Sequence, residues 1–133
     1  MTAVNLTTRS LPEVRGILAE FRQGLELLYG KRLVGVYLFG SYTRGEAEPE
    51  SDVDVLIVLD EVADYPGEVD RTGGLASELS LRHGLSLSRV FLSRRAWTES
   101  TDFFVRNVRQ EGIAAEAGIG EVAGEGRSRP SCG

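Results

Sequence analysis

The sequence predicts one small α/β domain in which helices flank a mixed sheet of three or more strands. Three observations lead to this fold class. Helical and strand-like apolar patterns alternate along the chain. Its 133 residues suffice for a single modest core and not for two. The link between the first two predicted strands is too short for a parallel crossover, which favours an antiparallel or mixed sheet.

The first predicted element is an amphipathic helix at residues 11–29. Ser10 and Glu13 have the spacing of a capping box, in which each side chain hydrogen bonds to the backbone of the other residue. Apolar residues then recur at helical spacing, and Gly30 favours a stop. We expect this helix to pack against the sheet.

Two apolar runs predict neighbouring strands. Residues 33–39 form a short run with β-branched and aromatic residues and two largely apolar faces, which is typical of a strand that is buried on both sides. Residues 53–59 predict the second strand. Between them, residues 42–47 are compatible with one or two helical turns and residues 48–51 with a loop.

The second half of the chain predicts a helix at residues 68–83, after a surface connection at residues 60–67. A third strand is expected at residues 85–92, where apolar and polar residues begin by alternating. One or two short helices should close the core after Ser93, and they carry three aromatic residues that we interpret as core or interface anchors: Trp97, Phe103 and Phe104.

We place the domain at residues 1–113. The remaining residues, 114–133, are rich in Gly, Ser and Glu without a convincing period, and we expect them to form a disordered tail.

Composition excludes several classes of function. A net charge of −5 argues against broad, sequence-independent nucleic-acid binding, which needs a basic surface. The single cysteine, Cys132, and the single histidine, His83, exclude a disulfide framework and a zinc site rich in Cys or His. No apolar run is long enough to span a membrane, and the first residues lack the apolar core of a signal peptide. We therefore expect a protein of the reducing cytoplasm that binds neither membrane nor nucleic acid directly.

The richest chemistry lies between the first two predicted strands. Gly40 lets the backbone approach a ligand after a buried strand, and Ser41 adds a hydroxyl beside the free NH groups of a helix start, which together suit nucleotide phosphates. Asp52 and Asp54 project from the same face of the second strand because side chains alternate. Two such carboxylates suit Mg²⁺, which takes oxygen ligands and commonly shares them with substrate phosphates.

These residues resemble a known signature. Gly40–Ser41, the following Arg44–Gly45, and residues 51–54 are similar to the Gly-Ser, ten residues, Asp-x-Asp motif of the DNA polymerase β-like nucleotidyltransferase superfamily. The likeness is greatest to its small stand-alone MNT members, and residues 104–113 resemble the way in which those proteins end.

The resemblance implies a minimal nucleotidyltransferase that uses ATP and Mg²⁺ to move AMP onto an acceptor. Many MNT proteins are antitoxins paired with a HEPN ribonuclease toxin, and some add AMP to a toxin tyrosine. Carried over to this chain, Gly40, Ser41 and Arg44 would bind the nucleotide. Asp52 and Asp54 would bind the metal and, with Ser41, carry catalysis.

One departure from the family pattern narrows this expectation. Active members usually place a third carboxylate on the next strand, where this chain offers only Ser86 and Ser88. Three interpretations stay open: slow catalysis with one metal ion, a third carboxylate from the partner or from another segment such as Asp60, or binding without catalysis.

The sequence therefore leaves three functional hypotheses. The first is a Mg²⁺-dependent enzyme that adenylylates a partner protein. The second is an antitoxin that neutralises its HEPN partner by binding alone. The third is a transferase of the aminoglycoside-modifying kind, for whose additional acceptor-binding domain 133 residues leave little room.

Overall fold

The computed structural model describes residues 9–48 and 52–115. Within these residues four strands form one sheet in the order β3-β2-β1-β4. Strand β1 pairs antiparallel with β2 and β4, whereas β2 pairs parallel with β3. The prediction of a mixed sheet is confirmed. The strand bounds are β1 Leu33–Phe39, β2 Val53–Leu59, β3 Leu87–Ser93 and β4 Ile113–Ala114.

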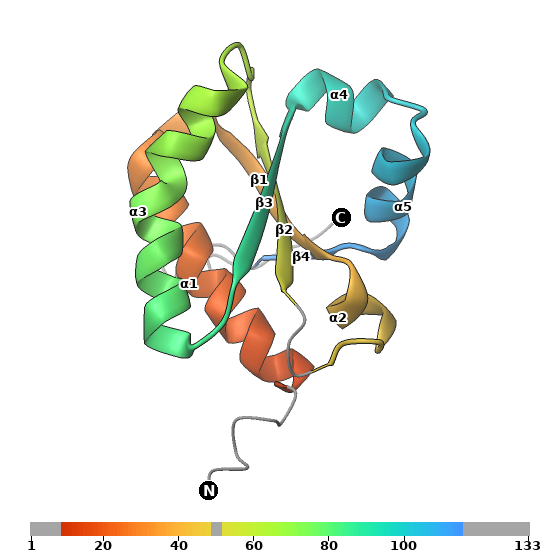
Figure 1. Cartoon of the computed structure of the whole chain (residues 1–133). Coiled ribbons are helices and arrows are strands. Elements are labelled where there is room, and N and C mark those ends of the chain that lie inside the picture. The colour runs from red at the N-terminus through yellow and green to blue at the C-terminus, as the bar shows by residue number, and fades with distance from the viewer. Residues whose placement is uncertain (1–8, 49–51, 116–133) are drawn as a thin grey trace, which may run out of the picture.

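Helices cover both faces of this sheet (Figure 1). Helices α1 (Leu11–Tyr29) and α3 (Tyr65–His83) lie together on one face. Helices α4 (Arg94–Glu99) and α5 (Phe103–Glu111) lie on the other, and α2 (Ser41–Arg44) follows directly at the end of β1. A single 3-10 turn, η2 (Gly30–Arg32), connects α1 to β1.

Helix α1 begins and ends where the sequence predicts. The backbone NH of Ser10 donates to Glu13 Oε1 at 2.8 Å, and the NH of Glu13 donates to Ser10 Oγ at 3.2 Å. These two bonds complete the predicted capping box and satisfy NH groups that the helix leaves unpaired. Gly30 ends the helix with a φ of 56°, a conformation that glycine adopts without steric cost.

Helix α3 begins earlier than predicted, so the last three residues of the expected surface connection at 60–67 are helical. Asp64 is the reason, because its carboxylate accepts a hydrogen bond from the NH of Gly67 at 3.1 Å and caps the helix. Pro66 also suits the first turn, where no NH is needed. Strand β3 is displaced as well, since it runs from Leu87 rather than from residue 85.

The side chains of β2 alternate between two packed layers. Val53, Val55, Ile57 and Leu59 join the large core under α1 and α3, whereas Leu56 and Val58 pack toward α4 and α5. Asp54 has the same phase as Leu56 and Val58, so it faces the α5 side of the sheet.

Two aromatic pairs pack α4 and α5 against β1. Trp97 stacks on Tyr37 with ring centroids 4.5 Å apart, and Phe104 meets Phe39 edge-on at 5.2 Å. Such pairs add about 0.5–1.5 kcal/mol beyond the area that they bury. Trp97 and Phe104 are therefore packing anchors, as predicted, whereas Phe103 remains 75% exposed.

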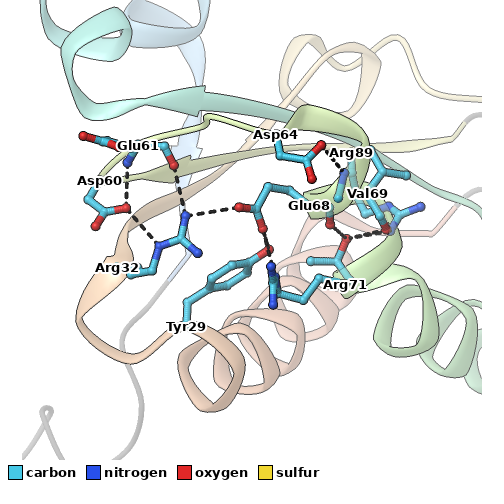
Figure 2. A network of polar contacts seen from close by, with 11 residues as sticks. Tyr29, Arg32, Asp60, Glu61, Asp64, Glu68, Val69, Arg71 and Arg89 are labelled. Atoms are coloured by element: carbon cyan, nitrogen blue, oxygen red, sulfur yellow. Dashed lines mark hydrogen bonds and ion pairs between the residues drawn. The ribbon is translucent and has the colours of Figure 1, made fainter.

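A buried carboxylate ties α1, the turn after it and α3 together (Figure 2). Glu68 is only 4% exposed and accepts hydrogen bonds from Tyr29 Oη at 2.7 Å, Arg32 Nη2 at 3.1 Å and Arg71 Nε at 3.1 Å. Burial alone would raise the pKa of Glu68, but these bonds outweigh it and lower the pKa. Burial and the bond to Glu68 raise the pKa of Tyr29 to about 12.

The end of the sheet reaches into the stretch that we expected to form a tail. Ala114 pairs with Tyr37 in β4, and Ala115 is buried. Residues 116–133 of that stretch lie outside the described residues, so the tail stays a prediction. In the part of the chain that the structure covers, no helix has the length and apolar character needed to cross a membrane.

We predict that Glu68→Gln lowers the free energy of unfolding by about 1–3 kcal/mol at neutral pH, because it weakens hydrogen bonds to a buried charge. Folding lowers the pKa of Glu68 below its ordinary value of about 4.3. The charged carboxylate therefore stabilises the protein fully at pH values above this ordinary value, and the stabilisation is lost as the pH falls through the folded-state pKa. The variant should therefore lose less stability on acidification than the native protein, as urea unfolding at several pH values would measure.

Glu78→Gln is the matched control, because Glu78 lies on the same helix with its side chain 61% exposed. It should change stability by no more than about 0.5 kcal/mol. Equal losses in the two variants would contradict a specific role for the buried network.

Candidate functional site

The turn after β1 requires glycine. Gly40 has a φ of 86° and a ψ of −150°, a region that is essentially restricted to glycine. The NH and the hydroxyl of Thr43 both donate to the Gly40 carbonyl, at 3.1 and 2.8 Å. A Cβ at position 40 would lie 2.2 Å from Asp54 Oδ2. Backbone strain and lack of space therefore both exclude a larger residue.

Antiparallel pairing brings this turn to the predicted metal ligands. Phe39 at the end of β1 pairs with Asp54 near the start of β2. Gly40, the next residue, therefore contacts the carboxylate of Asp54. Asp52 is exposed just before β2 and Asp54 is partly buried within it. The loop residue Ser51 lies outside the described residues.

The two aspartates interact electrostatically. Burial raises the pKa of Asp54, and the negative charge of Asp52 raises it further, while Arg44 opposes both. The repulsion between these two carboxylates at the start of β2 favours the binding of a cation. Their oxygen atoms are ligands that suit Mg²⁺. The residues present therefore fit the metal that the resemblance implies.

A cavity of about 290 Å³ lies against this turn and strand. Three predicted residues line it: Gly40, Arg44 and Asp54. Ser41 and Asp52 do not line it, although Ser41 begins α2 and the charge of Asp52 acts on Asp54. The volume is near the lower end for small-molecule sites, about 300 Å³.

Six further residues line the cavity and were not predicted as part of a site. Phe39 ends β1, Thr43 closes the turn, and four residues come from α5: Phe104, Asn107, Val108 and Glu111. The α5 residues are spaced by three and four, so they share one helix face. The sequence contained one signal for them: Asn107 and Glu111 are polar but lie on the same helix face as Phe104, which we expected to be buried.

Arg44 is shared between charges around the cavity. Its Nε donates to Glu46 Oε1 at 2.9 Å, and this bond is the main cause of a raised pKa of Arg44. The charges of Glu111 and Asp54 raise that pKa further. Both carboxylates therefore lie within electrostatic reach of the guanidinium group.

Strand β3 brings no carboxylate to Asp54, as the sequence suggested. Ser88 is the β3 residue that pairs with Asp54. The proposal that Asp60 could supply a third carboxylate is wrong. Asp60 follows the far end of β2 and accepts from Arg32 Nε at 3.1 Å. Six residues of strand separate it from Asp54, about 20 Å at about 3.3 Å per residue.

A mixed sheet that brings a Gly-Ser turn to an Asp-x-Asp pair at the start of the next strand is the arrangement of the nucleotidyl-transferring class. Comparison with known families agrees, because the profile of the nucleotidyltransferase domain matches residues 18–115. The chain belongs to the nucleotidyltransferase domain family.

Relatives of this chain carry more specific names. It is 36% identical over 94 residues to a proposed protein adenylyltransferase of Methanocaldococcus jannaschii, covering 70% of this chain and 88% of that protein. It is 37% identical over 89 residues to the protein adenylyltransferase MntA of Thermococcus cleftensis, covering 67% and 88%.

Solved structures share the fold. A toxin-antitoxin complex with AMP-PNP contains a chain with a TM-score of 0.52 and 19% identity, covering 77% of this chain and 75% of that one. A chain from the complex of a tri-AMPylated Shewanella oneidensis HEPN toxin with its MNT antitoxin gives a TM-score of 0.51 at 18% identity, covering 79% and 73%. At these identities the likeness concerns the fold.

We predict that Gly40→Ala lowers the free energy of unfolding by about 1–3 kcal/mol, because alanine is strained at this φ and its methyl group displaces Asp54. Gly74→Ala is the control, since Gly74 lies exposed within α3 with nothing near its added Cβ. It should stabilise the protein by about 0.5–1 kcal/mol. Thermal unfolding measures both, and equal effects of the same sign would refute the account of the turn.

Proposed function

We propose that this protein is a Mg²⁺-dependent enzyme that transfers AMP from ATP to a hydroxyl of a partner protein. The observation that carries the proposal is the contact between Gly40 and Asp54 at the wall of a cavity, with the charge of Asp52 beside it. The relatives named protein adenylyltransferases favour a protein acceptor over a small molecule.

Each residue has a distinct role in this proposal. Gly40 lets the triphosphate approach the backbone, and Ser41 adds a hydroxyl at the same turn. Arg44 faces the cavity and attracts phosphate oxygens. Asp52 and Asp54 would hold Mg²⁺, which when bound neutralises phosphate charge and aligns the attacking and leaving oxygens.

The transfer itself exchanges one phosphorus–oxygen bond for another. The acceptor hydroxyl gives up its proton to a base as its oxygen forms a bond to the α-phosphorus of ATP. The bond from that phosphorus to the oxygen that bridges to the β-phosphate breaks, and pyrophosphate leaves with the electron pair. The protein contributes mainly position and charge, as is general in phosphoryl-type transfers.

We further propose that the partner is a HEPN-type toxin and that this chain is its antitoxin. A relative at 37% identity carries the name MntA, and a solved complex of the same fold is described as a toxin-antitoxin pair MntA-HpeT. Another pairs an MNT antitoxin with a HEPN toxin that carries AMP. These names support the same pairing for this chain.

A second candidate function is neutralisation by binding alone. The observation that favours it is Ser88, which stands beside Asp54 where active members of the superfamily usually have a carboxylate. In this case the fold would serve as a binding surface for the toxin and the cavity would be a remnant.

We predict that the protein transfers label from α-labelled ATP to its partner in the presence of Mg²⁺, and that Asp52→Asn with Asp54→Asn lowers this rate about a hundredfold or more. Both ligands of the metal are then lost. Asp70→Asn is the control, because it removes the negative charge of an exposed aspartate on α3, and it should retain the native rate. Equal labelling by the native protein and the double variant would exclude the enzymatic mechanism.

The two candidate functions differ in cells that produce the toxin. If catalysis silences the toxin, co-expression of the double variant should no longer restore growth, while Asp70→Asn should restore it. If the double variant protects cells fully and still forms the complex, binding alone is sufficient and the second candidate function holds.

A further inference from the structure

The end of α5 is held against the turn that begins the site. In β4, Ile113 pairs with Leu38 and Ala114 with Tyr37, and the NH of Ala115 donates to the carbonyl of Val36 at 2.8 Å. Each step back along β4 corresponds to one step forward along β1. Glu111, two residues before Ile113, ends α5 next to this pairing and lines the same cavity as Gly40.

Gly112 lies in close contact with the backbone around it. A Cβ at position 112 would lie 2.6 Å from the Val108 carbonyl oxygen and 3.3 Å from the Leu38 carbonyl oxygen. The chain therefore leaves α5 in close contact with the backbone of β1. Because Glu111 is the neighbouring residue, its position relative to β1 is fixed by backbone packing rather than by a flexible connection.

Glu111 faces the cavity that Asp54 also lines. The cavity is lined by α5 residues, among them Asn107 and Glu111, and by Gly40, Arg44 and Asp54. Both carboxylates act on the charge of Arg44. A molecule between α5 and β2 would thus meet Asp54 on one side and Glu111 on the other.

Helix stability does not explain an acidic residue at this position. Glu111 is the last residue of α5, and a negative charge there opposes the helix dipole. In the part of the chain that the structure describes, no hydrogen bond or ion pair holds the carboxylate of Glu111. Residues that break a local rule without structural compensation are expected at functional sites.

Metal binding does not explain it either. Within residues 9–48 and 52–115, no three acidic, histidine or cysteine side chains are grouped closely enough to hold one ion. Glu111 therefore shares the cavity with Asp54 without completing a three-ligand metal cluster. A carboxylate that lines the cavity and is not bound to metal is suited to accept a proton there.

We propose that Glu111 is the catalytic base of the transfer, a role for which β3 offers no carboxylate; this inference rests on the proposed function. As the acceptor oxygen bonds to the α-phosphorus of ATP, its proton passes to the Glu111 carboxylate. The bond from that phosphorus to the bridging oxygen breaks, and pyrophosphate departs with the electron pair. Glu111 then returns the proton to solvent.

The test compares Glu111→Ala and Glu111→Gln with the native protein and its partner. General-base catalysis contributes about 10²–10⁴-fold, so kcat should fall by that order. Binding of AMP-PNP with Mg²⁺, measured by calorimetry, should change by less than about twofold, because the proposal assigns the Glu111 carboxylate to the acceptor hydroxyl and not to the nucleotide or the metal. Asp54→Asn should instead weaken that binding.

Chemical rescue separates a base from a structural residue. Formate is a small carboxylate that fits the space vacated in Glu111→Ala, and added formate should restore part of the lost kcat. It should not restore activity to Asp54→Asn. Glu99→Ala, which removes a 66% exposed side chain on α4, is the matched control and should keep the native rate with or without formate.

Several results would overturn the assignment. Native-like kcat in Glu111→Ala would exclude it, as would a loss of activity that formate does not restore or a parallel loss of AMP-PNP binding. If the native protein binds AMP-PNP with Mg²⁺ but transfers no label from ATP, the proposed function fails and this inference fails with it. That outcome is recognised because the native protein itself is inactive.

Discussion

The structure depends on one close contact, in which the backbone of Gly40 lies against the carboxylate of Asp54. The antiparallel pairing of Phe39 with Asp54 creates this contact, and only glycine satisfies both the positive φ and the lack of space. The same contact leaves Asp54 partly buried beside Asp52, so its charge is costly until a cation compensates it. The fold thus accepts local electrostatic repulsion at this point, which a bound cation would relieve.

The two ends of β2 have opposite electrostatic character. At its start, the negative charges of Asp52 and Asp54 repel each other, and a cavity lies beside Asp54. At its far end, Arg32 pairs with Asp60 and with Glu68, whose carboxylate also takes hydrogen bonds from Tyr29 and Arg71 (Figure 2). Between the ends, alternate side chains fill the core under α1 and α3. The buried strand is therefore a rigid support from which the site is displayed.

Local signals in the sequence predicted the elements well where the determinants are local. The capping box, Gly30 and the apolar run of β1 gave correct bounds, and the short link predicted an antiparallel first pair. Helix α3 begins at Tyr65, three residues before the predicted start, because Asp64 caps it. The sequence did not predict the network around Glu68 or the place of Glu111 in the cavity, because both depend on residues far away in the chain. The separation of Asp60 from Asp54 likewise follows from strand length and not from motif spacing.

In the proposed function, a metal-bound nucleotide occupies the cavity between Gly40, Asp54 and α5. The most direct test is paramagnetic broadening of the backbone amide resonances by Mn²⁺ in the presence of AMP-PNP. We expect the strongest broadening at Gly40 and Asp54, with Glu111 also affected and Asp60, about 20 Å from Asp54 along β2, much less affected. Broadening centred on the Asp60 end of the strand, or spread evenly over the protein, would contradict the account.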